Sequence, residues 1–223
     1  MGILYIVATP IGNLEDLSKR ALRILSEVDL ILCEDTRITQ KLLTRYEIKT
    51  KTTSYHQHTE IKKIEEIIQL LSNGKNLALV SDAGTPGISD PGNRLIEQLN
   101  NWTIGQLTTI PIPGPSALTA AASISGFPMD KFVFLGFPPV KKKRKKFFEE
   151  AISSKYPTIL YESPYRIIKT LEEIALLTER KIVVCRELTK KFETIYRGSA
   201  KDILAGLAKD EIRGEFVVVV GDK

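Results

Sequence analysis

The sequence predicts an α/β fold whose sheets are covered by helices on both faces. Short apolar runs such as Ile3–Val7 and Leu77–Val80 alternate along the chain with segments whose apolar residues recur at helical spacing. These runs are continuous, which is typical of strands that are buried on both sides. Pro- and Gly-rich loops follow several of the runs directly. Repeated βα units of this kind are the mark of the α/β class.

The first half of the chain is predicted to alternate between strands and helices. We expect strands at residues 3–7, 29–35, 50–56, 77–82 and 107–112, and helices at residues 14–28, 37–46, 60–74 and 91–100. Asn13 can cap the first of these helices, because its side chain can accept a hydrogen bond from a backbone N–H of the first turn. Gly74 can end the third helix, since glycine readily adopts the left-handed conformation found there.

The second half continues the pattern after a proline-rich segment. Helices are expected at residues 115–125, from 141 onward, at 164–178 and from 199 onward, and strands at 131–137, 158–162, 181–186, 193–198 and 215–221. Pro115 and Ser116 suit the start of the first of these helices. The segment PIPGPS at 111–116 is the best domain boundary. It gives domains of residues 1–112 and 113–223, each of ordinary domain size.

The composition excludes several classes of protein. No stretch approaches membrane-spanning length, and the N-terminus lacks the basic region of a signal peptide, so we expect a cytoplasmic protein. Cys33 and Cys185 fall in predicted strands and form no C-x-x-C pair, so no disulfide or zinc site is expected. His56 and His58 share one face of a strand, but no third ligand is evident and we expect no metal. The net charge of +5 mildly favours a polyanionic partner.

Three Pro- and Gly-rich loops follow predicted strands: TPIGN at 9–13, SDAGTPGISDPG at 81–92 and PGPSA at 113–117. The second loop is both rigid and bare, since proline fixes φ while glycine removes the side chain, and we interpret it as a ligand loop. Ligands of open α/β sheets bind beyond the carboxyl ends of the strands, so we expect the three loops to form one pocket in a cleft between the domains. None of them matches the dinucleotide fingerprint or the P-loop.

These loops belong to a longer set of ordered motifs: VATPIGNLEDLSKRAL, CEDTR, YHQHTE, SDAGTPGISDPG, PGPSALTAA, YESPYRI, CRELTKKFE and GEFVVVVGD. From about Ile3 to Gly221, the chain closely resembles one family, the bacterial ribosomal RNA small subunit methyltransferases I. The resemblance implies the two-domain tetrapyrrole-methylase fold (class III methyltransferase), with S-adenosylmethionine in the interdomain cleft. It also implies methylation of the ribose 2'-hydroxyl of a cytidine in the decoding region of 16S ribosomal RNA, in the small ribosomal subunit.

The resemblance further implies which residues hold the cofactor, largely through backbone groups. The expected cofactor-binding residues are Pro10, Gly12, Asp82, Ala83, Gly84, Gly87, Ile88, Ser116, Ala117, Tyr161, Glu162, Leu188, Gly214 and Glu215. Outside the loops at 81–92 and 113–117, a plain turn or core role is an equal alternative for each of them.

Methyl transfer from a sulfonium is a direct displacement, so the enzyme must align the reactants and exclude water, and no covalent nucleophile is required. A ribose hydroxyl must lose its proton, so a carboxylate or histidine near the cofactor can act as general base. The candidates are Glu187, Glu34 and His56, in that order, with Asp35 and Glu162 behind them. Alternatively, Glu34 and Asp35 form an ordinary ion pair with Arg37, and His56 satisfies a backbone group.

The run KKKRKK at 141–146 is the strongest electrostatic feature, six consecutive cations that we expect to encircle a helix start. Such runs are often solvated faces, but a ribosomal substrate favours phosphate contacts instead. The expected RNA-binding residues are Lys141, Lys142, Lys143, Arg144, Lys145 and Lys146, with Arg37, Arg166 and Arg186 as further candidates.

Two other functions stay open from the sequence. One is a methylase of the same fold that acts on a tetrapyrrole and would not need the lysine run; the other is a non-enzymatic RNA-binding protein without cofactor affinity. The resemblance implies a homodimer. Some relatives carry a further C-terminal segment thought to help bind RNA, and this sequence stops after GEFVVVVGDK, so we expect RNA affinity to depend on the two domains or on dimerisation. Gln57 stands where many relatives have an acid, and we expect no catalytic role there.

Overall fold

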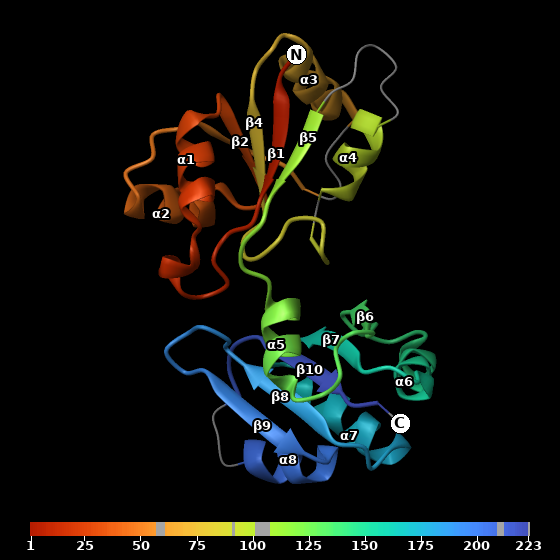
Figure 1. Cartoon of the computed structure of the whole chain (residues 1–223). Helices are drawn as coiled ribbons and strands as arrows, with labels where there is room; N and C mark the ends of the chain where they lie inside the picture. Colours follow the sequence, from red (N-terminus) through yellow and green to blue (C-terminus); the bar gives the residue numbers. More distant parts are fainter. Residues whose placement is uncertain (57–60, 91, 101–107, 209–211, 223) are drawn as a thin grey trace. The chain divides into compact units, whose positions relative to one another are not determined.

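A computed structural model describes residues 1–56, 61–90, 92–100, 108–208 and 212–222 of the chain (Figure 1). The chain divides into two compact units, Met1–Ser116 and Ala117–Lys223. The expectations for Gln57, for His58 and for a helix start at Pro91 lie outside the described residues. Among the described residues, no helix is long and apolar enough to cross a membrane.

The first unit is a parallel sheet between two pairs of helices. In chain order its elements are β1 (Ile3–Val7), η1 (Leu14–Asp16), α1 (Lys19–Glu27), β2 (Leu30–Cys33), α2 (Thr36–Arg45), β3 (Thr52–Ser54), α3 (Ile61–Ser72), β4 (Leu77–Val80), α4 (Asn93–Asn100) and β5 (Thr108–Ile112). The strand order is β3-β2-β4-β1-β5, and every pairing is parallel. Helices α1 and α2 pack on one face, and α3 and α4 pack on the other.

The helices on both faces of the sheet explain the continuous apolar runs. In β4, Leu77 and Leu79 pack toward α3 and α4, while Ala78 and Val80 pack toward α1 and α2. Successive side chains of a strand point to opposite faces, so a strand buried on both faces needs an apolar residue at every position. The predicted α/β class is therefore confirmed for this unit.

The first long helix begins later than predicted. Asn13 caps only the short turn η1, where its side chain accepts a hydrogen bond from the Glu15 N–H at 3.1 Å. Leu17 has extended backbone, and Ser18 caps α1 by accepting from the Ala21 N–H at 3.0 Å. Both residues are good caps by type. The apolar spacing alone could not tell which of them starts the long helix.

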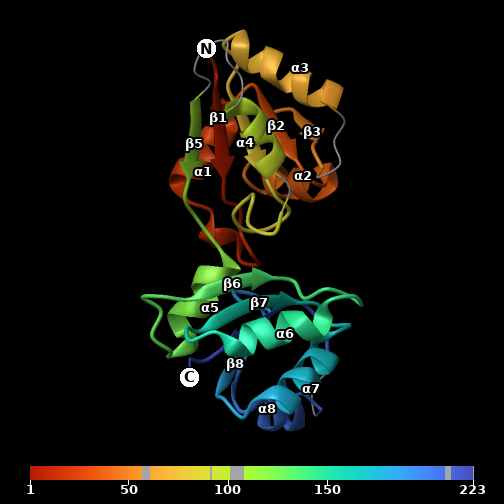
Figure 2. The same ribbon diagram turned by 90° about the vertical axis from the view of Figure 1, so that its right-hand side faces the viewer.

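The second unit has a mixed sheet. Its elements are α5 (Ala117–Ser125), β6 (Val133–Gly136), α6 (Arg144–Ser153), β7 (Thr158–Glu162), α7 (Ile167–Leu177), β8 (Ile182–Arg186), β9 (Thr194–Gly198), α8 (Ala200–Leu207) and β10 (Phe216–Val220). The strand order is β6-β7-β10-β8-β9, and only β6 and β7 are parallel. Helices α6, α7 and α8 pack on one face, while α5 contacts β10 from the other (Figures 1 and 2).

The antiparallel pairing of β8 and β9 follows from their short connection. Strands β8 and β9 are joined without a helix, and a parallel pair would need a crossover of a dozen or more residues. The last strand, β10, then inserts between β7 and β8 and runs against both. The repeated βα pattern expected for the whole chain thus holds strictly only in the first unit.

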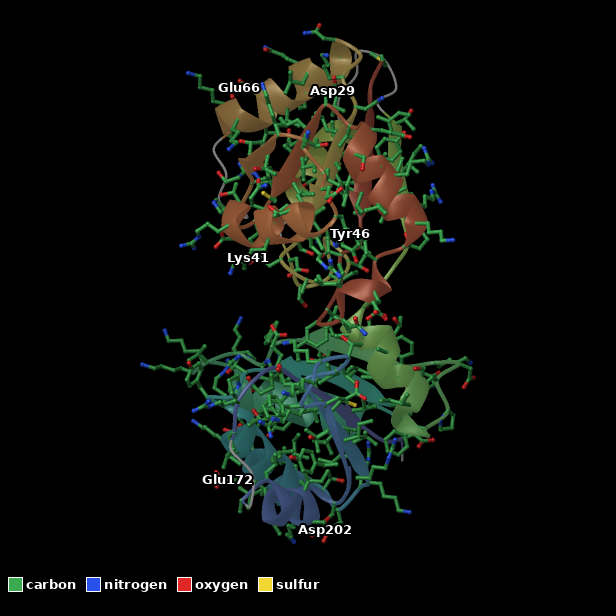
Figure 3. The ribbon with its side chains drawn as sticks, turned by 90° about the vertical axis from the view of Figure 1, so that its left-hand side faces the viewer. Asp29, Lys41, Tyr46, Glu66, Glu172 and Asp202 are labelled. Carbon is green, nitrogen blue, oxygen red and sulfur yellow. The ribbon has the colours of Figure 1, made fainter. Side chains whose placement is uncertain are left out.

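The two ends of the parallel sheet differ in chemistry (Figure 3). At the amino ends, Lys75 Nζ lies 2.8 Å from Asp29 Oδ1, and this hydrogen bond lowers the pKa of Asp29. At the carboxyl ends, where Lys41 of α2 lies, the chain forms the Pro- and Gly-rich loops. Ligands of parallel sheets bind at the carboxyl ends, so the candidate site belongs there.

Candidate functional site

The loops that follow β1 and β4 are tied to each other by the backbone. The Thr9 N–H donates to the Gly84 carbonyl at 2.9 Å, and the Gly84 N–H donates to the Thr9 carbonyl at 3.0 Å. Thr9 Oγ1 also donates to the Ser81 carbonyl at 3.2 Å. The two strands are neighbours, but their loops lead to helices on opposite faces (Figure 2). Such a divergence marks the crevice in which α/β sheets bind ligands.

Glycine is required at two positions of the loop at 81–92. Gly84 has φ +82° and Gly87 has φ +85°, a left-handed conformation that strains any L residue. A Cβ on Gly87 would lie 2.9 Å from Asn93 Oδ1, whereas a Cβ on Gly84 would make only ordinary contacts. Thr85 Oγ1 donates to the Pro115 carbonyl at 3.2 Å. The three loops singled out in the sequence therefore meet within the first unit.

Three carboxyl groups follow the carboxyl ends of β2 and β4, and they have different environments. Burial raises the pKa of Asp82, whose Oδ1 accepts the Asp35 N–H at 3.0 Å. Burial and then the charge of Asp82 raise the pKa of Glu34. In contrast, Arg37 donates to Asp35 at 2.6–3.2 Å and lowers its pKa to about 2. The expected ion pair is thus Asp35 with Arg37, and among the described residues Glu34 forms no salt bridge or hydrogen bond.

A pocket of about 210 Å³, which we call the strand-end pocket, lies beside Asp82. It is lined by Thr9, Pro10, Leu14, Ile38, Thr39, Lys41, Leu42, Ser81 and Asp82. Pockets that enclose a drug-sized ligand usually exceed about 300 Å³. The strand-end pocket is therefore smaller than the pockets that usually enclose a whole drug-sized ligand.

The second unit holds Glu187 in a fixed carboxylate site. Its Oε1 accepts from Lys190 Nζ at 2.8 Å and from the Glu215 N–H at 2.9 Å. Burial alone would raise the pKa of Glu187, but these two hydrogen bonds lower it below its usual value. A Cβ at Gly214, which has φ +85°, would lie 2.2 Å from Glu187 Cδ, so any other residue there would displace the carboxylate. Lys190 also lies 2.9 Å from Glu215 Oε2.

Tyr161 links β7 to the first turn of α5. Its hydroxyl accepts the Leu118 N–H at 3.1 Å, and its ring meets Phe134 and Phe137 edge-on, with centroids 4.9 and 5.5 Å away. Leu118 directly follows Ala117, so two of the expected cofactor residues are close neighbours here.

The structure places the side chain of Glu162 in the interior of the second unit. Its side chain has no exposed surface, and it lies 2.9 Å from Arg166 Nη2 while accepting from Thr170 Oγ1 at 2.6 Å. The Ser163 N–H donates to the same carboxylate at 2.8 Å. The carboxylate of Glu162 is thus fully engaged within the second unit. Arg166, expected to bind RNA, is also engaged here and donates to the Pro138 carbonyl at 3.0 Å.

The structure corrects the expectation for Arg144, which is only 4% exposed. Its guanidinium donates to Glu173 Oε2 and Thr170 Oγ1, each at 2.6 Å, and to the Pro139 carbonyl at 3.1 Å. The helix α6 begins at Arg144 itself, after Lys143 with φ +65°. The cations therefore do not encircle a helix start: Arg144 points inward, and the other five residues of the run are exposed.

The other expected site residues take the following places. Gly12, Ala83 and Ile88 are exposed in the loops of the first unit, and His56 follows β3 at the same edge of the sheet. In the second unit, Leu188 is buried next to Glu187, and Arg186 Nε donates to the Arg213 carbonyl at 2.9 Å. Among the described residues, no group of three His, Cys, Asp or Glu side chains could hold a metal ion.

Sequence reasoning missed three residues that shape these sites. Thr9 and Ser81 line the strand-end pocket and tie its loops, and Lys190 holds Glu187. Lys190 could have been found, because it follows Glu187 by three residues in a segment already quoted. The hydrogen bond between Thr9 and Ser81 joins residues 72 positions apart, and no local sequence pattern predicts it.

The fold and the strand-end loops define a class of protein. A family model described as Tetrapyrrole (Corrin/Porphyrin) Methylases matches residues 3–204, and the chain belongs to this family of methyltransferases. It is 44% identical over 224 residues to ribosomal RNA small subunit methyltransferase I of Thermotoga maritima, covering 100% of both chains. It is 46% identical over 222 residues to the Bacillus subtilis protein of the same name, covering 99% of this chain and 75% of the relative.

Solved structures share the fold. The methyltransferase CobJ matches with a TM-score of 0.72 at 19% identity, over 100% of this chain and 95% of the other. The cobalt precorrin-4 methyltransferase CbiF matches with a TM-score of 0.68 at 18% identity, over 98% and 94%. The predicted tetrapyrrole-methylase fold and the predicted family are therefore confirmed.

The buried position of Arg144 predicts a stability defect. Arg144→Gln should lower the free energy of unfolding by about 3–5 kcal/mol, because the buried charge of Glu162 loses a partner. Lys142→Gln, at an exposed neighbour, is the matched control and should change little. Urea unfolding followed by circular dichroism measures both, and equal midpoints for the two variants would contradict the prediction.

Proposed function

We propose that the protein uses S-adenosylmethionine to methylate the 2'-hydroxyl of a cytidine ribose in the decoding region of 16S ribosomal RNA, and that it does so in the cytoplasm. The observation that carries this proposal is the 44% identity to ribosomal RNA small subunit methyltransferase I over the whole length of both chains. A tetrapyrrole substrate has weaker support, since the solved tetrapyrrole enzymes are only 15–19% identical to this chain and share the fold alone.

The strand-end loops of the first unit fit the proposed cofactor. S-adenosylmethionine supplies, when bound, a methyl group on a positively charged sulfonium. Asp82 offers a carboxyl group at the edge of the strand-end pocket. Gly87 leaves the backbone bare, and Gly84 holds the loop in place through its bridge to Thr9. Bare backbone allows a ligand to approach the main chain closely. Pro10 would contact the cofactor from the opposite loop, and Gly12, Ala83 and Ile88 would flank it.

Glu34 is the general base that we propose, ahead of Glu187 and His56. A base works best when its pKa lies near the working pH. Burial raises the pKa of Glu34, whereas hydrogen bonds from Lys190 and the Glu215 N–H lower the pKa of Glu187. Glu187 would then orient Lys190 and the backbone at Glu215.

Glycine substitutions test whether the loop at 81–92 binds a ligand or is only a turn. Gly84→Ala should weaken binding of S-adenosylmethionine, because the added Cβ lies in the loop that we assign to the cofactor. Gly74→Ala is the matched control: it has φ +83°, with nothing within 4 Å of the new Cβ. Each substitution should cost about 1–2 kcal/mol of stability from the left-handed backbone. Calorimetry should find wild-type cofactor affinity only in Gly74→Ala. Equal cofactor affinities in Gly84→Ala and Gly74→Ala would show that the loop at 81–92 is only a turn.

Removal of the proposed base tests the chemistry. Glu34→Gln should lower kcat by roughly 10²–10⁴-fold while leaving cofactor binding intact. In the wild type the rate should fall as the pH falls through the pKa of Glu34, since only the ionised form accepts a proton. The raised pKa places this loss above the pH at which an ordinary glutamate, with a pKa of about 4.3, would cause it. A full rate in Glu34→Gln, with loss in Glu187→Gln, would reverse the assignment.

The exposed lysines at 141–143, 145 and 146 are proposed to hold the RNA by its phosphates. Replacing Lys142, Lys143 and Lys145 with glutamine should weaken RNA binding and flatten its salt dependence by roughly 0.7–0.9 for each phosphate that is no longer neutralised. Cofactor affinity should stay unchanged. The control removes three exposed cations of the same unit, with glutamine at positions 155, 181 and 201. If RNA binding has the same salt slope in the two triple variants, the run is only a solvated face.

We also propose that the protein is a homodimer, as the resemblance implies. Two copies would present a larger basic surface to an RNA that greatly exceeds one unit in size. Light scattering should then report twice the mass of one 25.0 kDa chain; a single-chain mass would count against the dimer.

A further inference from the structure

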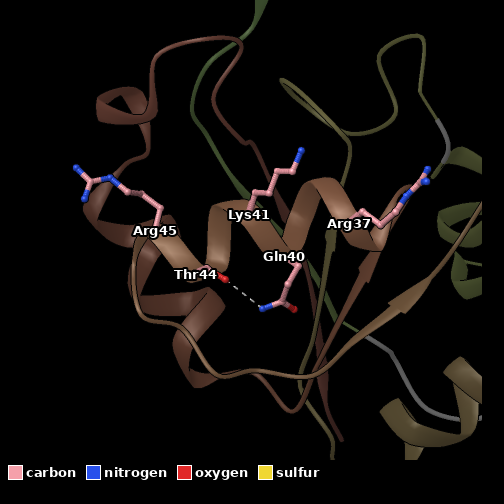
Figure 4. Close-up of a pocket in the computed structure, with 5 residues that line it drawn as sticks. All are labelled: Arg37, Gln40, Lys41, Thr44 and Arg45. Atoms are coloured by element: carbon pink, nitrogen blue, oxygen red, sulfur yellow. Dashed lines mark hydrogen bonds between the residues drawn. The ribbon is translucent and has the colours of Figure 1, made fainter.

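Helix α2 carries three cations along one side. Arg37, Lys41 and Arg45 are spaced by four residues, and Gln40 and Thr44 lie next to them on the helix surface (Figure 4). A spacing of four residues advances about 6 Å along an α-helix and rotates by only about 40°. The three charges therefore form a line along the exposed surface of the helix.

These charges are scarcely neutralised. The helix Thr36–Arg45 contains no Asp or Glu, and all three cations are exposed. Arg37 pairs with Asp35 at the start of the helix, whereas within the described residues Lys41 and Arg45 form no ion pair. On α1, by contrast, Arg23 pairs with Glu27 at 2.7 Å. Solvated helix faces usually mix charges in the manner of α1.

The cations border a surface hollow that adjoins the candidate site. Arg37, Gln40, Lys41, Thr44 and Arg45 line a hollow of about 500 Å³ (Figure 4). Lys41 also lines the strand-end pocket, together with Thr9 and Asp82. A ligand bound along α2 is thus next to the pocket that Asp82 lines.

We propose that this side of α2 binds the phosphodiester backbone of the RNA substrate beside the nucleotide that is methylated, with Lys41 where the RNA reaches the strand-end pocket. The inference rests on the proposed function and adds a binding surface to it. A line of cations with polar neighbours suits a repeating polyanion, because phosphate contacts need positive charge and not an apolar surface. Arg37 is partly engaged by Asp35, so Lys41 and Arg45 supply most of the attraction.

The test compares two double variants of the full chain. Lys41→Gln with Arg45→Gln removes the line on α2; Lys19→Gln with Arg20→Gln removes two exposed cations of α1 and is the control. Filter binding of 16S ribosomal RNA over a range of salt concentrations gives the affinity and the salt slope. Methylation of small subunits gives kcat and KM, and calorimetry gives the affinity for S-adenosylmethionine.

The α2 variant should bind RNA several-fold more weakly, with a salt slope lower by about 1 for each phosphate that the helix no longer neutralises. Its KM for RNA should rise, because the interaction removed is uniform binding. Arg45→Gln alone removes a cation that does not line the strand-end pocket; it should raise KM for RNA while kcat at saturating RNA and the cofactor affinity stay unchanged. The α1 variant should match the wild type. The inference is overturned if the two double variants have the same RNA affinity and salt slope. Failure of the proposed function looks different: the wild type then methylates no ribosomal RNA, whatever its RNA affinity.

Discussion

Two backbone hydrogen bonds between Thr9 and Gly84 hold the candidate site of the first unit together. The strands β1 and β4 are neighbours, yet their chains leave toward opposite faces of the sheet. Loops that diverge in this way would separate at the strand ends unless something joined them. The bridge supplies that link, and it requires Gly84 at φ +82°, so the bare composition of the loop is set by backbone geometry as well as by any ligand.

The second unit relies on a buried ion network for a similar purpose. Glu162 is enclosed by Arg166 and Thr170, and Arg144 donates to the same threonine. Both arginines also donate to carbonyls of the preceding segment, at Pro138 and Pro139. A buried charge without its partners is strongly unfavourable, so this network fixes the start of α6 and with it the exposed lysines of the run. The buried Arg144 thus sets the orientation of the exposed lysines around it.

Local pattern predicted much of this molecule, and long-range contacts decided the rest. The buried strands, the loop at 81–92 and the left-handed Gly74 followed from apolar runs and residue types. The burial of Arg144 did not, because its partner Glu173 lies 29 residues away and nothing in a lysine run marks one member as internal. The capping choice between Asn13 and Ser18 failed for a related reason, since both residues suit a helix start.

In the first unit, acidic and basic side chains lie on separate surfaces that meet at Lys41. The half-buried carboxyl groups of Glu34 and Asp82 lie at the strand ends, and the loop at 81–90 has two aspartates and no Lys or Arg. A sulfonium cofactor is positively charged, so this region would attract it; RNA is a polyanion and would be repelled there. The cations of α2 have the opposite preference. Two ligands of opposite charge can thus approach one sheet edge from separate surfaces, and the surfaces meet at Lys41, which lines the strand-end pocket together with Asp82.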